Sequence, residues 1–208
     1  MTGKFKKIYI ASAVIAAAFF AGAAAQAATI SVLPANASGV EGSTLNFTID
    51  GAGFDTNTLG GGLQLSWDPA VLQLQTGSIT PNTAVFDSDP FDGTPLNLIG
   101  SVNDGAGTWT GFSAFADFWG AGVGSANFNI VQLTFTLLNP GTSAINVSGV
   151  DENPWVQLSS LDPINVMYTG AFVNVTPVPL PASVWLLGSA LGALGYSVRK
   201  RKTAAEAV

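Results

Sequence analysis

The sequence predicts an all-β protein built around a single jelly-roll-type β-sandwich. Apolar and polar residues alternate over several short runs, Gly, Pro, Asn and Asp separate these runs, and no helical periodicity occurs between residues 28 and 178. An alternation with a period of two places successive side chains on opposite faces of a strand. Many short strands separated by turn residues are typical of a sandwich, and 208 residues suit one such domain.

The alternation assigns the strands in order. It is clearest in the runs 45–50, 63–68, 72–75, 131–137, 145–147 and 166–175. Asp68-Pro69 and Asn139-Pro140-Gly141 have the turn chemistry expected between strands. We therefore place the sandwich at residues 28–175.

The first 27 residues read as a secretory signal peptide. Three lysines precede an apolar run, which ends in small residues before Ala28. The alternative is a membrane helix that is not cleaved. The predicted cleavage site is formed by Ala25, Ala27 and Ala28.

The C-terminal region has three parts in order. A Pro-rich stalk and motif at 176–183 precedes an apolar transmembrane helix at 184–198 and a basic cytoplasmic tail at 199–208. Basic residues remain on the cytoplasmic side of a membrane, so both basic ends lie inside and the domain between them lies outside.

The segment V-P-L-P-A-S-V-W-L-L-G-S-A-L-G-A-L-G-Y-S-V-R-K-R-K resembles a PEP-CTERM sorting signal of the V-P-L-P-A variant. The resemblance implies that an exosortase-type cysteine transpeptidase is the partner of this tag. It also implies a Gram-negative bacterium, an inner-membrane anchor before processing, later release to the cell surface or exterior, and association with exopolysaccharide. A plain C-terminal anchor is the alternative. The motif residues are Val178, Pro179, Leu180, Pro181 and Ala182.

A second resemblance concerns the strands themselves. The segments at 30–50, 61–74 and 131–147 are similar to the opening strands and a later strand pair of cohesin domains, and W-D-P-A-V-L is the most specific piece. Cohesins are jelly-roll sandwiches that bind calcium-loaded dockerins, and related sandwiches bind carbohydrate. The resemblance implies the fold, whereas the residues of a dockerin-binding face find no match in this sequence.

The charge distribution excludes several functions. All seven Lys and Arg residues lie in the terminal tails, whereas twelve of the thirteen acidic residues lie between 28 and 178. A region without cations cannot neutralise phosphates, which excludes nucleic-acid binding. The chain has no His and no Cys, which excludes histidine-based triads, thiol nucleophiles and thiolate or imidazole zinc sites. We expect a protein that is not an enzyme.

Two acidic clusters are candidates for calcium, the one cofactor the sequence suggests. Asp87, Asp89 and Asp92 provide carboxylates in a turn-rich segment, as Ca²⁺ requires, although their spacing is not that of an EF-hand. Asp151, Glu152 and Asn153 form a second cluster. The alternative for both clusters is a solvated acidic turn.

An aromatic run offers a candidate ligand-binding face. On a regular strand, Trp109, Phe115, Asp117 and Trp119 share one side, and flat rings beside a carboxylate suit sugar stacking. The alternative is that a loop covers this side.

Two functions therefore remain open. The first is a non-enzymatic surface or matrix protein associated with exopolysaccharide or adhesion. The second is a carbohydrate- or protein-binding module that uses the aromatic face.

Overall fold

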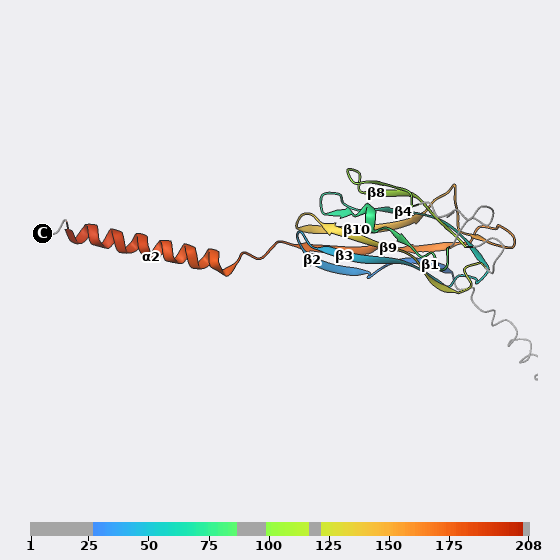
Figure 1. The fold of residues 1–208 in the computed structure, drawn as a ribbon, viewed down its shortest axis with the longest axis horizontal. Helices are drawn as coiled ribbons and strands as arrows, with labels where there is room; N and C mark the ends of the chain where they lie inside the picture. The colour runs from blue at the N-terminus through green and yellow to red at the C-terminus, as the bar shows by residue number, and fades with distance from the viewer. Residues whose placement is uncertain (1–26, 87–98, 117–121, 206–208) are drawn as a thin grey trace, which may run out of the picture.

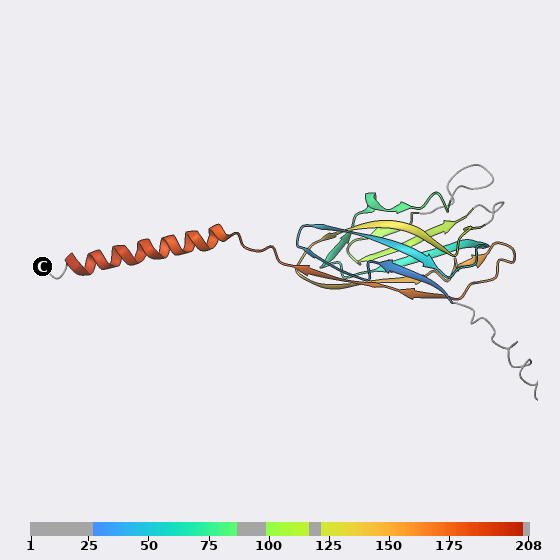
Figure 2. The ribbon, with the colours of Figure 1, turned by 90° about the horizontal axis from the view of Figure 1, so that it is seen from below.

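The computed structural model describes residues 27–86, 99–116 and 122–205, in which two β-sheets pack face to face and a helix follows them (Figures 1 and 2). The first sheet has the order β12-β1-β3-β9-β5, with β6 also paired to β9. The second has the order β2-β13-β10-β4-β8-β7, with β11 also paired to β4. The predicted all-β sandwich is confirmed. The strands are β1 (Ala28–Leu33), β2 (Asn36–Val40), β3 (Thr44–Ala52), β4 (Thr58–Ser66), β5 (Leu72–Leu74), β6 (Thr80–Pro81), β7 (Ser101–Asn103), β8 (Thr108–Phe115), β9 (Asn127–Leu137), β10 (Gly141–Gly149), β11 (Val156–Gln157), β12 (Val166–Thr169) and β13 (Ala171–Thr176), and the helix is α2 (Ala182–Ala205).

The inner faces of the two sheets form one hydrophobic core. On β3, Phe47 and Ile49 are buried, and their antiparallel partners on β9 are Leu133 and Val131, which are also buried. The residues between them on these strands point outward, as the alternation predicts.

One end of the core is aromatic. Four rings, those of Phe54, Phe86, Phe128 and Trp155, contact one another with centroids 5.1–6.2 Å apart. Trp155 lies directly on the backbone of β4, because a Cβ atom at Gly61 would come within 2.7 Å of the Trp155 ring. The absence of a side chain at Gly61 therefore permits the packing of this indole.

The two end segments of the domain each pass from one sheet to the other. The predicted strand at 166–175 is divided at Gly170 into β12, in the first sheet, and β13, in the second. The N-terminal segment divides in the same way into β1, which pairs with β12, and β2, which pairs with β13, both in parallel. Parallel pairing places the start of β1 and the end of β13 at opposite ends of the sandwich (Figure 1).

The helix α2 stands away from the sandwich on an extended segment (Figures 1 and 2). It begins at Ala182 and continues to Ala205, so it includes part of the segment that the sequence assigns to the basic tail. Several apolar side chains on it are exposed, with Trp185 at 73% and Leu186 at 69%. Within the described residues, no helix has the length and hydropathy required to span a membrane.

Candidate binding face

The outer side of β3 and β9 is a platform of amides and hydroxyls. Asn46 lies opposite Thr134, and Thr48 lies opposite Gln132, so the four side chains form two cross-strand pairs on one face. We call these four residues and their neighbours Ser78 and Thr80 the polar face. Both strands alternate regularly here, which is why their polar residues gather on the side away from the core.

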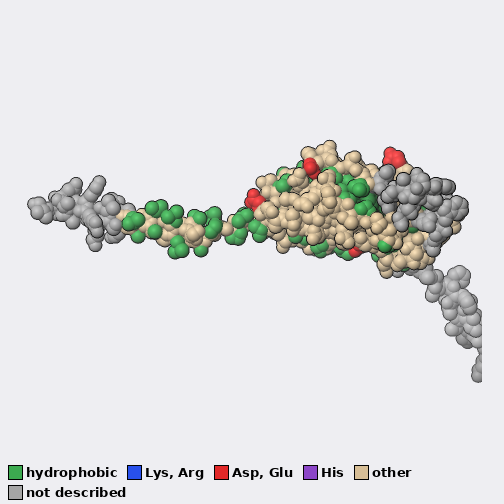
Figure 3. Space-filling model, viewed as in Figure 1, with side chains coloured by type: hydrophobic (Ala, Val, Ile, Leu, Met, Phe, Trp, Pro, Cys, Tyr) green, Lys and Arg blue, Asp and Glu red, His purple; other side chains and the backbone are tan. Residues whose placement is uncertain are grey.

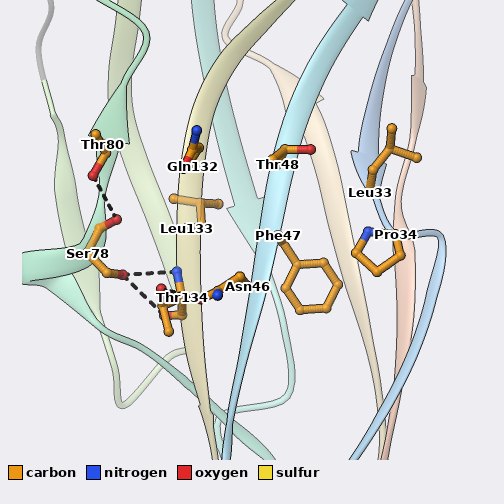
Figure 4. Close-up of a pocket in the computed structure, with 10 residues that line it drawn as sticks. All are labelled: Leu33, Pro34, Asn46, Phe47, Thr48, Ser78, Thr80, Gln132, Leu133 and Thr134. Atoms are coloured by element: carbon orange, nitrogen blue, oxygen red, sulfur yellow. Dashed lines mark hydrogen bonds between the residues drawn. The ribbon is translucent and has the colours of Figure 1, made fainter.

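A shallow pocket of about 680 Å³ opens over the polar face (Figure 4). Leu33 and Pro34, at the end of β1, form its apolar border, and the Leu33 side chain is 40% exposed. Phe47 and Leu133 form the floor from the core side, since each is 1% exposed. The pocket therefore offers a small apolar surface beside a row of hydrogen-bonding groups.

Hydrogen bonds hold part of this row in place. The Thr134 hydroxyl donates to Oδ1 of Asn46 at 2.9 Å, and the Thr134 backbone N–H donates to Oγ of Ser78 at 2.9 Å. Ser78 in turn donates to the backbone carbonyl of Gln75 at 2.7 Å. The short 3-10 helix Thr76–Ser78 thus completes the edge of β9 between β5 and β6.

Other groups of the polar face remain available to a ligand. Among the described residues, the side-chain amide of Gln132 has no hydrogen-bond partner, and the Asn46 amide nitrogen has none either. An exposed amide offers two donors and an acceptor that can exchange water for a ligand.

The side chains of the polar face are uncharged, and one carboxylate borders them. The nearest carboxylate on β3 is Asp50, which accepts hydrogen bonds from Asn129 at 2.7 Å and from the Thr48 hydroxyl at 3.3 Å. In the view of Figure 3, the carboxylates of the described surface lie apart, and no cationic side chain is seen. The polar face therefore offers no cationic side chain to an anionic ligand.

The aromatic face predicted on β8 is wrong at Trp109. This residue is 0% exposed, its Nε1 donates to the Ile99 carbonyl at 2.6 Å, and its ring contacts the Phe112 ring at 4.8 Å. Phe112 is also buried, although regular alternation places these two rings on opposite sides.

A β-bulge causes this difference. Leu65 pairs with Trp109 and Leu63 pairs with Phe112, so two residues of β8, Thr110 and Gly111, lie opposite the single residue between those partners. Gly111 has a φ of 74°, which an L side chain rarely adopts. The extra residue turns both aromatic rings into the core.

Most of the remaining predicted site residues lie outside the part of the chain that the structure describes. Phe115 ends β8 and is partly buried, whereas Asp117 and Trp119 lie outside the described residues. Asp87, Asp89 and Asp92 also lie outside them. Asp151 and Glu152 are exposed in a turn, and the described part of the chain contains no group of three acidic residues arranged to hold a metal ion.

Sequence reasoning missed the polar face as a site. The signal was present in Asn46, Thr48, Gln132 and Thr134, which alternate with core residues in two of the predicted strands. What the sequence does not show is that these two strands are neighbours, with Ser78 and Thr80 beside them.

Solved structures with the same architecture are cohesin domains. The matching chain of the CaDoc0917–CaCohA2 complex, whose cohesin comes from Clostridium acetobutylicum, has a TM-score of 0.56 and 17% identity over 72% of this chain and 99% of that one. The fold of this domain is cohesin-like. A Clostridium thermocellum complex of the OlpC cohesin with Doc435 gives a TM-score of 0.55, 14% identity and coverages of 73% and 95%. The sixth cohesin of Acetivibrio cellulolyticus scaffoldin B, bound to a Cel5 dockerin, gives a TM-score of 0.54 and 15% identity over 72% of this chain and 99% of that one.

These likenesses concern the fold. No family model matches the chain, and no curated protein matches it. The similarity supports the cohesin-like fold that the core strands predict. The predicted sorting signal at 178–182 has no counterpart in these structures.

Proposed function

We propose that this chain is an exported, non-enzymatic surface protein whose cohesin-like domain binds an uncharged polysaccharide through the polar face. Its N-terminal signal carries it across the inner membrane. Its C-terminal tag anchors it until an exosortase-type transpeptidase cuts it and releases it to the cell surface.

The positions of the two processing sites support the export part of the proposal. Ala28 is the first residue of β1 and is 4% exposed, so the predicted signal peptide ends where the fold begins. The motif at 178–182 lies between β13 and α2, with Val178 58% and Leu180 66% exposed. A protease can reach an exposed, extended segment without unfolding the sandwich.

The availability of the Gln132 and Asn46 amides is the observation that carries the binding proposal. Sugar hydroxyls both donate and accept hydrogen bonds, as amide side chains do. The apolar border at Leu33 and Pro34 suits the C–H face of a pyranose ring. An anionic polymer is disfavoured, because residues 28–178 contain twelve carboxylates and no cation.

A protein partner is the second candidate. The cohesins of similar fold were solved in complex with dockerins. Phe172, on the outer side of β13, is 65% exposed, which is unusual for a large aromatic residue on a sheet face. A protein ligand would use this second sheet instead of the polar face.

Retention on immobilised polysaccharide tests the binding proposal. The mature protein is passed over immobilised neutral exopolysaccharide from its host, with Gln132→Ala and Asn46→Ala as variants. Asn146→Ala, which removes an exposed amide from the outer side of β10, is the matched control. We expect each polar-face variant to bind about fivefold more weakly, since one hydrogen bond contributes roughly 1 kcal/mol, and the control to bind normally.

Equal retention of all variants contradicts binding through the polar face. Loss of retention in Phe172→Ser alone would place the polysaccharide-binding site on the second sheet instead of the polar face. Mass spectrometry of the mature protein tests export separately, and we expect a chain that starts at Ala28 and ends near the sorting motif.

A further inference from the structure

A second pocket, of about 570 Å³, opens at the end of the sandwich where β1 begins. Its lining includes Ala27 and Ala28, which flank the predicted cleavage site, and Asp55, the one titratable residue of the lining. The peptide bond that a signal peptidase would cut therefore borders a pocket that also holds a carboxylate.

The fold holds this part of the chain in place. Ala28 pairs with Val166, and Thr29 pairs with Ala52, three residues before Asp55. Ala28 is 4% exposed, whereas Ala27 is exposed. Cleavage before Ala28 would leave a new amino terminus fixed by strand pairing at the pocket.

The carboxylate is itself oriented. Oδ1 of Asp55 accepts the backbone N–H of Asn57 at 2.9 Å, in the turn between β3 and β4. Among the described residues, Oδ2 has no hydrogen-bond partner. One oxygen thus fixes the side chain and the other is open to a donor.

We propose that this pocket is the seat of the mature amino terminus, in which the α-ammonium group of Ala28 is the counter-ion of Asp55. The inference rests on the removal of the signal peptide proposed above. Residues 28–178 contain no Lys, Arg or His, so the new α-ammonium is the only cation in this range. Processing therefore creates the domain's single positive charge beside a carboxylate.

The pairing has a measurable consequence for the amine. A carboxylate nearby favours the ammonium form, so the pKa of the Ala28 amine lies above its ordinary value of about 7.7–8.0. The other titratable groups on the surrounding elements are Asp50 on β3, Asp162 before β12 and Tyr168 on β12. The two carboxylates act in the same direction as Asp55, and the tyrosine is neutral in this pH range.

The absence of lysine from residues 28–178 permits a direct test. The full chain is expressed in its native host, and the mature protein is treated with an amine-reactive acylating reagent between pH 6 and 9. Peptide mass spectrometry separates the label on Ala28 from any label on Lys200 or Lys202. The variants are Asp55→Asn, which keeps an acceptor for the Asn57 N–H, and Glu41→Gln, which removes an equal charge in the turn before β3.

We expect wild-type acylation of Ala28 to follow an apparent pKa above 8. We expect Asp55→Asn to react about three- to tenfold faster at pH 7, because each unit of pKa changes the reactive fraction about tenfold. Glu41→Gln should react like the wild type.

Three results would overturn the inference, and they are distinguishable. If the Ala28 amine of the wild type has its ordinary pKa, no anion faces it, and this result needs no variant. Equal rates in wild type and Asp55→Asn show that Asp55 is not its partner. A first residue other than Ala28 places the failure in the proposed processing, whereas polysaccharide retention tests the polar face independently.

Discussion

The strands β3 and β8 differ in how well regular alternation describes their two faces. From Thr44 to Ile49, β3 alternates without interruption, so its polar residues face outward and its apolar residues fill the core. On β8, one extra residue at Thr110–Gly111 reverses the alternation, and two aromatic residues enter the core together. Regular alternation therefore yields a reliable outer face, whereas a glycine within a strand makes the assignment of faces unsafe.

Trp109→Ala tests this contrast with the largest expected effect. The side chain is fully buried and donates to the Ile99 carbonyl, so its removal should lower the free energy of unfolding by about 3–5 kcal/mol. Urea denaturation measures the loss. Gln132→Ala, on the polar face, is the control and should change stability by less than about 0.5 kcal/mol. Equal stability of the two variants would contradict the burial of Trp109.

Gly111→Ala tests the bulge itself. A Cβ atom at this position meets no nearby side chain, so the cost comes from the φ of 74° and should be about 1–2 kcal/mol. Gly77→Ala is the matched control, because it has no positive φ and no atom within 4 Å of a new Cβ. If both variants unfold at the same urea concentration, the bulge is not what holds Trp109 and Phe112 inside.

These residues also show how far the sequence could predict the fold. The alternation found the core positions of β3, of β4 from Leu63 onward and of β9 from Val131 onward, because each of these stretches has one buried face. It did not divide 166–175 between two sheets, because the change of sheet at Gly170 depends on pairing with β1 and β2. Strand pairing is long-range, and a single period of two contains no information about it.

The candidate site was less predictable than the fold. The aromatic run predicted an exposed ring at Trp109, yet a large apolar side chain is more stable in the core than on a surface. In the sequence, Asn46 and Gln132 have the pattern of ordinary strand-surface residues, and only the pairing of β3 with β9 places them on one face. A site that consists of neutral polar residues from neighbouring strands leaves little trace in the sequence.

Ser78→Ala tests the support of the polar face. Without the hydroxyl, the Thr134 N–H loses its acceptor at 2.9 Å, and we expect a loss of about 1 kcal/mol. The same variant should weaken polysaccharide retention, because Thr134 then orients Asn46 less firmly. Ser148→Ala, on the outer side of β10, provides the control in both measurements. A stability loss without any change in retention would remove Ser78 from the site and leave it only a structural role.

The smallest effect is expected at Tyr168, where β12 faces the end of β10. Burial raises the pKa of this phenol above its ordinary value of 10.0, because the phenolate is poorly solvated in the fold. The unfolded chain therefore ionises first, so the stability that the neutral phenol contributes is complete below about pH 10 and is lost as the pH rises through the folded-state pKa. Urea denaturation between pH 9.5 and 11 should show that the free energy of unfolding falls more steeply with pH for the wild type than for Tyr168→Phe. Tyr168 is the only tyrosine between residues 28 and 178, so tyrosinate absorbance of the mature domain reports its ionisation directly. An identical pH dependence of the free energy of unfolding in the two proteins would show that the Tyr168 hydroxyl is solvated. An absorbance midpoint at the ordinary pKa would show the same.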